Sequence, residues 1–415
     1  MITKFEVSNY KSIKSLALAM RPFMVLVGPN GAGKTNVVRA LQLLGDLLSR
    51  GTTDPAREEG WGQIVHREKK PARGGLKLAA TLMVPPLRGG PAVEARVSLS
   101  LRGKVGDHDV IVASEELRLT SKKSSLELKW ANGRLETDLG DDLALWEMVG
   151  LPRSASTRQD LQERLDANFG RQVQLFPDKP TSLQLFNRRL GFAFYIINQS
   201  FAIVRLRLDA SALRSDARFQ ADGDNVLGPS GEGLPVAVDR LRGRKDEPAA
   251  QFKPILDALR EVYPRIEDVV PEAFAQGRVT LGFRERGIAE PIPLDGVSDG
   301  VLHALALLIA LQQRRPGLLA IEEPENALHP WSVRKIMAQA QTSSTGQVLI
   351  TTHSETVVNA VLDPESLFIV ESDDQGTTVE PATSKEKALT IILNETGQKL
   401  GDIWIDGSLG GVPLR

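Results

Sequence analysis

The stretch Gly28-Pro29-Asn30-Gly31-Ala32-Gly33-Lys34-Thr35 decides the fold of this chain. It fits the pattern G-x-x-x-x-G-K-[ST], in which glycines let the backbone curl so that amide N–H groups point into one cavity. An apolar run over 23–27 precedes it and suits a buried parallel strand. Beyond it, apolar residues recur at helical spacing over 37–48. A glycine-rich segment between a strand and a helix predicts a phosphate-binding loop.

The residues of this loop suit a nucleoside triphosphate, ATP in the first instance, together with Mg²⁺. Lys34 is expected to reach the β- and γ-phosphates, and the Thr35 hydroxyl is expected to ligate Mg²⁺. The positive end of the following helix adds to the attraction for phosphate. The plain alternative is a glycine turn that matches by chance, and the flanking strand and helix argue against it. The expected nucleotide contacts are Asn30, Gly31, Ala32, Gly33, Lys34, Thr35 and Asn36.

Two acidic residues, Glu322 and Glu323, end a second apolar run that begins at Leu318. A buried strand that ends in two acids places them at the carboxyl edge of a sheet, where nucleotides bind. We expect Glu322 to help hold Mg²⁺ and Glu323 to orient or activate the attacking water. The alternative is an acidic cap at the start of the next helix, and that plainer role is assigned to Glu325.

Two further segments complete an ordered set of four. In Val297-Ser298-Asp299-Gly300, a serine and a bare helix N-terminus make an anion site, which we expect to bind a phosphate held by a second subunit. The plain reading of the same residues is an N-cap before an apolar helix. His353 ends the strand pattern 347–352 and is expected to hydrogen-bond the γ-phosphate. Taken alone, a histidine at a strand end is more often structural.

Three weaker candidates lie outside these segments. Gln63 is a candidate glutamine for contact with Mg²⁺ and the attacking water, and the plain reading is a solvated loop residue. Two basic runs are candidate nucleic-acid surfaces, although such runs are usually solvated. The first run is Arg67, Lys69, Lys70 and Arg73, and the second is Arg205, Arg207, Arg214 and Arg218.

Composition narrows the class of protein. A chain of 415 residues has room for two or three domains. Its formal net charge of −1 argues against nonspecific coating of nucleic acid by the whole surface. The absence of cysteine excludes disulfides and thiolate chemistry and is compatible with a reducing cytoplasm. No signal-peptide core is visible, and the longest apolar run, 301–311, is too short to span a bilayer. We therefore expect a cytoplasmic protein that does not engage a membrane.

Alternation of strand and helix patterns after Ser298 predicts a parallel sheet covered by helices. Segment 51–75 is expected to be a loop, and 76–139 a series of short strands with a hairpin at Asn132-Gly133. The predicted fold class is α/β, a P-loop head with a mixed sheet, a β-meander and a helical insert. The predicted division is a nucleotide-binding core over 1–50 and 290–380, a β-rich lobe over 51–140, a helical and β insert over 141–289, and a tail over 381–415.

Together, the four segments resemble the ABC-type ATPase family that includes RecF, SMC proteins and the overcoming-lysogenization-defect (OLD) ATPases. The opening Val7-Ser8-Asn9-Tyr10-Lys11-Ser12-Ile13 is similar to the first strand and turn of that family, where a basic residue, Lys11 here, lies near the adenine. Segment 321–330 looks most like the OLD-like bacterial subgroup. Glu322 stands where many relatives carry Asp, which lengthens the reach to Mg²⁺. The resemblance covers about 1–50 and 290–372.

The resemblance implies an ATPase that works as a homodimer or a higher homo-oligomer. ATP would be sandwiched between two heads, with Lys34, Thr35, Glu322, Glu323 and His353 from one chain and Ser298 and Gly300 from the other. OLD nucleases continue into a Toprim domain with an acidic metal cluster, and no such cluster is visible after His353. The resemblance therefore favours an anti-phage defence ATPase that controls a separately encoded effector, a nuclease or Toprim-like protein. The alternative is a RecF-like repair or chromosome-maintenance ATPase that binds DNA.

Overall fold

A computed structural model describes most of the chain. The described residues are 1–66, 75–85, 92–103, 110–131, 134–149, 183, 191–215, 217–218, 227–243, 248–273, 278–313, 317–343, 346–385 and 399–410.

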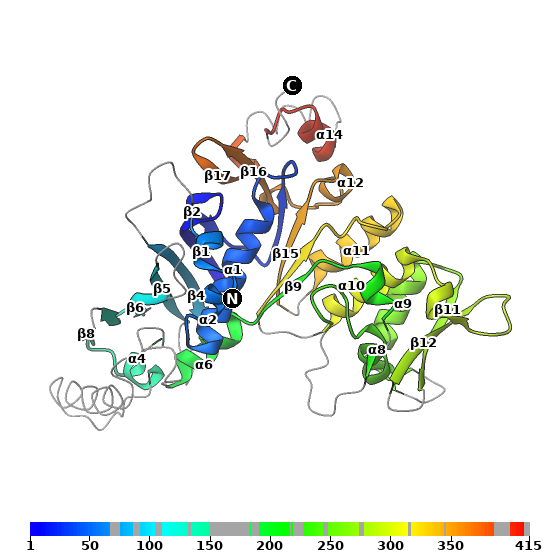
Figure 1. The fold of residues 1–415 in the computed structure, drawn as a ribbon, viewed down its shortest axis with the longest axis horizontal. Coiled ribbons are helices and arrows are strands. Elements are labelled where there is room, and N and C mark those ends of the chain that lie inside the picture. Colours follow the sequence, from blue (N-terminus) through cyan, green and yellow to red (C-terminus); the bar gives the residue numbers. More distant parts are fainter. Residues whose placement is uncertain are drawn as a thin grey trace.

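A six-stranded sheet forms the centre of the molecule (Figure 1). Its strand order is β17-β16-β3-β15-β14-β9, and all neighbours pair in parallel except the hairpin of β16 and β17. The carboxyl ends of β3, β15 and β14 therefore meet at one edge, and the phosphate-binding loop follows β3 at that edge. The strands are β3 (Phe23–Val27), β9 (Ile203–Leu206), β14 (Leu318–Glu322), β15 (Gln347–Thr352), β16 (Leu367–Asp373) and β17 (Gly376–Pro381).

Alternate residues of the central strands enter two separate cores, because successive side chains of a strand point to opposite faces. Met24 and Leu26 of β3 pack in one core, with α1 and α6. Val25 and Val27 pack in the other core, with helices from the second half of the chain. Helix α10 is buried along almost its whole length in this second core. Four short helices are described below, and the others in the described residues are α1 (Lys34–Arg50), α6 (Gly191–Ser200), α8 (Leu234–Arg242), α9 (Lys253–Val262), α10 (Asp299–Gln312), α11 (Pro330–Thr342), α12 (Glu355–Val358) and α14 (Leu400–Ile405).

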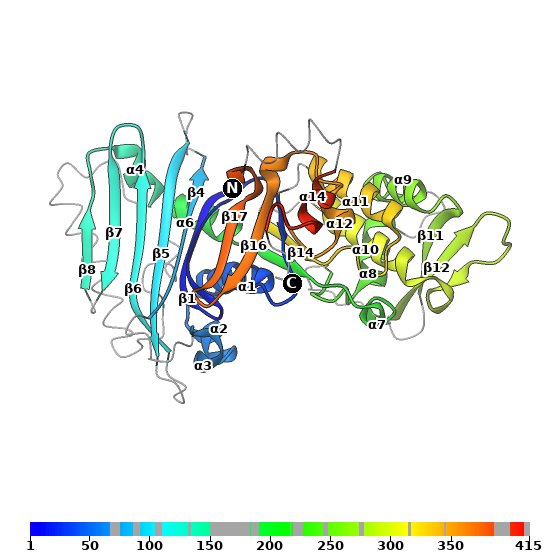
Figure 2. The same ribbon diagram turned by 90° about the horizontal axis from the view of Figure 1, so that it is seen from above.

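A seven-stranded antiparallel sheet packs over α1 and shares the first core (Figure 2). Its order is β2-β1-β4-β5-β6-β7-β8. The opening strands pair with Val7 opposite Leu16, and the expected hairpin is confirmed by Ala131 opposite Arg134. The two residues of its turn, 132 and 133, lie outside the described residues. The strands are β1 (Ile2–Tyr10), β2 (Ile13–Ala19), β4 (Leu76–Val84), β5 (Val93–Gly103), β6 (Val110–Thr120), β7 (Ser125–Ala131) and β8 (Arg134–Asp138).

A small antiparallel sheet lies at the opposite end of the molecule, beside α8 and α9 (Figure 2). Its strands are β10 (Ala217–Arg218), β11 (Ile266–Ala273), β12 (Arg278–Glu285) and β13 (Ile292–Pro293). Strand β9, from the segment predicted as an insert, instead forms the edge of the central sheet. No helix in the described ranges is long and apolar enough to cross a membrane.

The expectation of a loop over 51–75 is wrong for its first part. Helices α2 (Asp54–Glu58) and α3 (Trp61–Ile64) form there. Pro55 stands in the first turn of α2, where proline costs no hydrogen bond. Trp61 and Ile64 are buried in the first core, so tertiary packing stabilises turns whose polar composition indicated a loop. Short helices also form at α4 (Leu143–Met148) and α7 (Ala210–Leu213).

Candidate nucleotide site

The phosphate-binding loop depends on two glycines with left-handed backbone. Gly31 has a φ of 84° and Gly33 a φ of 101°. A Cβ on Gly33 would lie 2.2 Å from the Thr377 Oγ1 of β17, whereas a Cβ on Gly31 would meet nothing within 4 Å. Thr377 Oγ1 also donates to the Ala32 carbonyl at 3.1 Å. The loop is thus bonded to β17, and α1 begins directly after it with its N-terminus at the loop.

Lys34 folds back over this loop. Its Nζ donates to the Gly28 carbonyl at 2.6 Å and to the Pro29 carbonyl at 2.9 Å. Burial lowers the pKa of Lys34, and the nearby charges of Glu323, Glu325 and Glu322 oppose that shift. The ammonium group therefore bonds to the loop that is expected to hold phosphates and experiences the charges of the acids at the end of β14.

Thr35 and Glu322 meet although 287 positions separate them in sequence. The Thr35 hydroxyl donates to Glu322 Oε2 at 3.0 Å, and Arg205 of β9 donates through Nε to Glu322 Oε1. A hydroxyl beside a carboxylate is an oxygen donor pair of the kind that Mg²⁺ takes alongside water and substrate phosphates. The residues present therefore fit the metal that the sequence predicted.

Glu323 adopts a left-handed backbone, with a φ of 51°, directly after β14. Such a conformation costs a non-glycine residue free energy and is found most often at functional sites. The Glu323 backbone N–H donates to the Thr351 carbonyl at 2.8 Å, and Asn326 Nδ2 donates to Glu323 Oε2 at 3.2 Å. The break in strand geometry after Glu322 and these two bonds hold the second acid in place at the sheet edge.

His353 lies between two carboxylates. Its Nδ1 is 3.7 Å from Glu323 Oε1 and 3.7 Å from Glu325 Oε1. Glu325 Oε1 accepts hydrogen bonds from Thr352 Oγ1 at 2.6 Å and from the His353 backbone N–H at 3.3 Å. Glu325 is therefore not the helix cap predicted from sequence, since His329 caps α11. It instead ties the loop after β14 to the end of β15.

Ser298 and Gly300 begin α10, as the sequence predicted. Ser298 is the N-cap residue but its side chain makes no capping bond, and its carbonyl accepts from Val301 at 3.1 Å. A Cβ on Gly300 would lie 2.7 Å from Tyr263 Oη and 2.9 Å from the Ala327 carbonyl. The start of α10 is therefore packed against the loop that follows Glu323.

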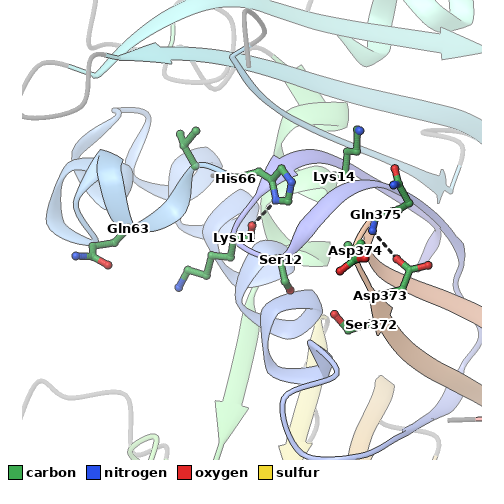
Figure 3. Close-up of a pocket in the computed structure, with 11 residues that line it drawn as sticks. Lys11, Ser12, Lys14, Gln63, His66, Ser372, Asp373, Asp374 and Gln375 are labelled. Atoms are coloured by element: carbon green, nitrogen blue, oxygen red, sulfur yellow. Dashed lines mark hydrogen bonds between the residues drawn. The ribbon is translucent and has the colours of Figure 1, made fainter. Parts of the chain in front are cut away.

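Lys11 and Gln63 line a cavity of about 870 Å³ beside the phosphate-binding loop (Figure 3). Lys11 Nζ is 3.2 Å from Glu59 Oε2 and 5.3 Å from the centre of the Tyr10 ring. Gln63 has no hydrogen bond to Thr35 or Glu322 in the part of the chain described here. The role of Gln63 at the metal therefore stays a prediction. The other lining residues are Ser12, Lys14, Val65, His66, Ser372, Asp373, Asp374, Gln375 and Gly376.

A hydrogen-bonded set under the loop was not foreseen from sequence. Ser12 Oγ lies 2.7 Å from Thr377 Oγ1, and Asn36 Nδ2 donates to Ser12 Oγ at 2.7 Å. The Asn36 side chain, expected to contact nucleotide, is thus engaged with the turn between β1 and β2. A single serine and a single threonine carry no sequence signal of a pairing across 365 positions.

Two arginines of the second basic run make contacts within the chain. Arg205 pairs with the buried Glu322. Arg214 donates to the Leu294 and Val297 carbonyls and to Asp299 at the start of α10. Both guanidinium groups therefore belong to the candidate site, and their role on a phosphate-facing surface stays a prediction. Nothing is described of the side chain of Arg218, and the first basic run lies outside the described residues.

The fold and the site define a P-loop ATPase head of the ABC and SMC type. A family described as "AAA domain, putative AbiEii toxin, Type IV TA system" matches residues 23–359, and the chain belongs to it. The solved structure described as an SMC head bound to the C-winged helix domain of ScpA has a TM-score of 0.51 at 13% identity. That likeness covers 91% of this chain and 97% of the other, and it shows a shared fold.

Curated relatives match shorter segments. The chain is 42% identical to the OLD nuclease of Thermus scotoductus over 48 residues, which are 11% of this chain and 9% of that protein. It is 38% identical to the Old nuclease of Escherichia phage P2 over 65 residues, 14% of this chain and 11% of that protein. It is 30% identical to the DNA replication and repair protein RecF of Beutenbergia cavernae over 124 residues, which are 28% of this chain and 31% of that protein. The chain spans less than a third of each of these relatives.

Proposed function

We propose that this protein binds ATP with Mg²⁺ and hydrolyses it in a site that two copies complete between them. The observation that carries the proposal is the bond from the Thr35 hydroxyl to Glu322, at 3.0 Å. It joins the end of the phosphate-binding loop to the first acid of β14, which is the pairing that a metal–triphosphate site requires.

Each residue then has a role set by its position. Lys34 and the amide groups of the loop bind the β- and γ-phosphates, and Thr35 and Glu322 hold the metal. When bound, Mg²⁺ neutralises charge on the phosphate oxygens. Glu323 accepts a proton from water as the water oxygen forms its bond to the γ-phosphorus, and the bond from that phosphorus to the bridging oxygen of ADP breaks. His353, fixed by Glu325, hydrogen-bonds the γ-phosphate.

The start of α10 supports the proposal that a second copy is needed. Its first residues present a serine whose side chain makes no capping bond and the positive end of a 14-residue helix. Both features suit a phosphate. Within its own chain this end packs against Tyr263 and the loop after β14. We propose that it faces the γ-phosphate held by a second copy, so that hydrolysis depends on dimerisation.

The biological role that we propose is control of a separately encoded effector during phage infection. The family description names a toxin of a toxin–antitoxin system, and two of the matched relatives are OLD nucleases. ATP binding would hold the dimer in one state, and hydrolysis would release it. The predicted effector is a nuclease or Toprim-like protein, in keeping with the activity that the relatives' names record.

A second candidate is a DNA-maintenance ATPase, which the match to RecF over 124 residues favours. In that case DNA would stimulate hydrolysis, and binding would weaken with salt because phosphate contacts release counterions. The defence role instead predicts hydrolysis that is indifferent to DNA.

One experiment tests the ATPase and separates these roles. The ATPase rate is measured for wild type and Glu323→Gln, with and without duplex DNA, and mass is measured by light scattering with Mg·ATP. We expect Glu323→Gln to bind ATP, to stop hydrolysis and to accumulate as a dimer, and Lys34→Ala with Glu323→Gln to stay monomeric. Hydrolysis by Glu323→Gln at the wild-type rate would refute the role of the second acid. Stimulation of hydrolysis by DNA would favour the DNA-maintenance role. The defence role would be supported if cells with the wild-type protein reduce phage plaque formation and cells with Glu323→Gln do not.

A further inference from the structure

Strand β9 brings two arginines to the two acids of the site. It pairs in parallel with β14, with Arg205 opposite Ala320. Positions 205 and 207 are two apart, so their side chains leave the same face of an extended segment. Arg205 bonds to Glu322, and Arg207 Nη2 lies 3.7 Å from Glu323 Oε2. Each acid therefore has one arginine from β9 beside it.

The two ion pairs differ in burial. The side chains of Arg205 and Glu322 are 19% and 2% exposed, whereas those of Arg207 and Glu323 are 57% and 22% exposed. Burying a carboxylate is costly unless a partner charge compensates for the lost hydration, whereas exposed ion pairs contribute little. Arg205 is therefore the partner that compensates for the burial of Glu322. Arg207, two residues away in an exposed ion pair, provides a matched control.

The two oxygens of Glu322 are divided between two partners. Oε1 accepts from Arg205, and Oε2 accepts from the Thr35 hydroxyl. A glutamate side chain has one more rotatable bond than an aspartate, so its carboxylate needs an additional restraint to face a metal in one orientation. A guanidinium bonded to one oxygen supplies that restraint and leaves the other oxygen directed at Thr35.

We propose that Arg205 is a positioning residue of the metal site: it holds Glu322 by one oxygen so that the other, beside Thr35, is presented to the divalent cation. This inference rests on the proposed function, which identifies the ligand of the site as a metal–nucleotide complex. Arg205 would then affect the affinity for the metal and not the affinity for the nucleotide. The reason is that Arg205 contacts Glu322, whereas Lys34 contacts the phosphate-binding loop.

The test measures Mn²⁺ binding by the full chain with a non-hydrolysable ATP analogue, read as loss of the free Mn²⁺ signal in electron paramagnetic resonance. Arg205→Gln is expected to weaken Mn²⁺ binding by about 10- to 100-fold, the usual effect of removing a group that orients a metal ligand. Affinity for the analogue without metal should be unchanged. Arg207→Gln, which removes the same charge from the exposed pair, should bind Mn²⁺ as wild type does.

Arg205→Lys guards against a variant that does not fold. It keeps a cation beside the buried Glu322 but replaces the guanidinium with a single point of charge. It should bind Mn²⁺ more weakly than wild type and more tightly than Arg205→Gln. Equal Mn²⁺ affinity in wild type and folded Arg205→Lys, or an equal loss in Arg207→Gln, would overturn the proposal. If Mn²⁺ binding depends on Arg205 but the wild-type protein does not hydrolyse ATP, the role of Arg205 is upheld and the proposed hydrolysis is contradicted.

Discussion

Replacement of Gly33 by alanine should destabilise the protein more than the same change at Gly31. Both residues have a left-handed backbone, with φ values of 101° and 84°. An L-residue pays about 1–2 kcal/mol for that conformation, so both variants share this cost. Only at Gly33 does the new Cβ collide with other atoms, at 2.2 Å from Thr377 Oγ1, 2.8 Å from Thr377 Cγ2 and 2.9 Å from Ser12 Oγ. Overpacking of this kind adds about 1–3 kcal/mol.

The expected loss in free energy of unfolding is therefore about 1–2 kcal/mol for Gly31→Ala and about 2–5 kcal/mol for Gly33→Ala. Urea denaturation followed by circular dichroism measures both. Thr377→Ala removes the two nearest of the three atoms that Cβ would meet and leaves Ser12 Oγ. The double variant with Gly33→Ala should therefore be less destabilised than the sum of the two single variants, by about 0.5–3 kcal/mol. Equal losses at Gly31 and Gly33, or strict additivity with Thr377→Ala, would refute the claim that β17 shapes the loop.

Other contacts of the site lead to three shorter predictions. Gly300→Ala, whose Cβ would meet Tyr263 Oη at 2.7 Å, should cost about 1–3 kcal/mol in urea denaturation; an unchanged midpoint would contradict the packing of α10. Glu325→Ala leaves Thr352 and the His353 N–H without their acceptor. It should cost about 1–3 kcal/mol and slow steady-state ATP hydrolysis, and a wild-type rate would rule out its role in fixing His353. Because burial lowers the pKa of Lys34, the unfolded chain binds its proton more tightly. Stability should rise more steeply with pH in wild type than in Lys34→Met as the pH approaches the ordinary lysine pKa of about 10.4 from below, and equal pH dependence of stability in the two proteins would contradict this.

Local sequence patterns predicted the glycine-rich loop between β3 and α1, the two acids at the end of β14 and the start of α10. Each of these depends on a few neighbouring residues whose backbone preferences are strong, such as the glycines at 31 and 33. The fold class was predictable for the same reason, because strand and helix patterns alternate in order along the chain.

The partners of these residues were not predictable, because they come from distant segments. Arg205 reads as one of several arginines in a run until β9 is placed beside β14. The role of Glu325 depends on a turn with a left-handed backbone at two non-glycine residues, Glu323 and Ala327. Sequence rules assign such conformations to glycine and asparagine, so the pattern indicated a simple cap instead.

The claim that two copies complete each site is tested most directly by mixing two inactive variants. Lys34→Ala removes the amine that we propose binds the phosphates, and Ser298→Arg places a long cation where the second copy's phosphate is expected. Each variant alone should lack ATPase activity while remaining folded by circular dichroism. The account predicts that the mixture regains activity, because a mixed dimer contains one site in which both contributing halves are unaltered. A mixture that stays inactive although the two variants form mixed dimers would contradict the shared site.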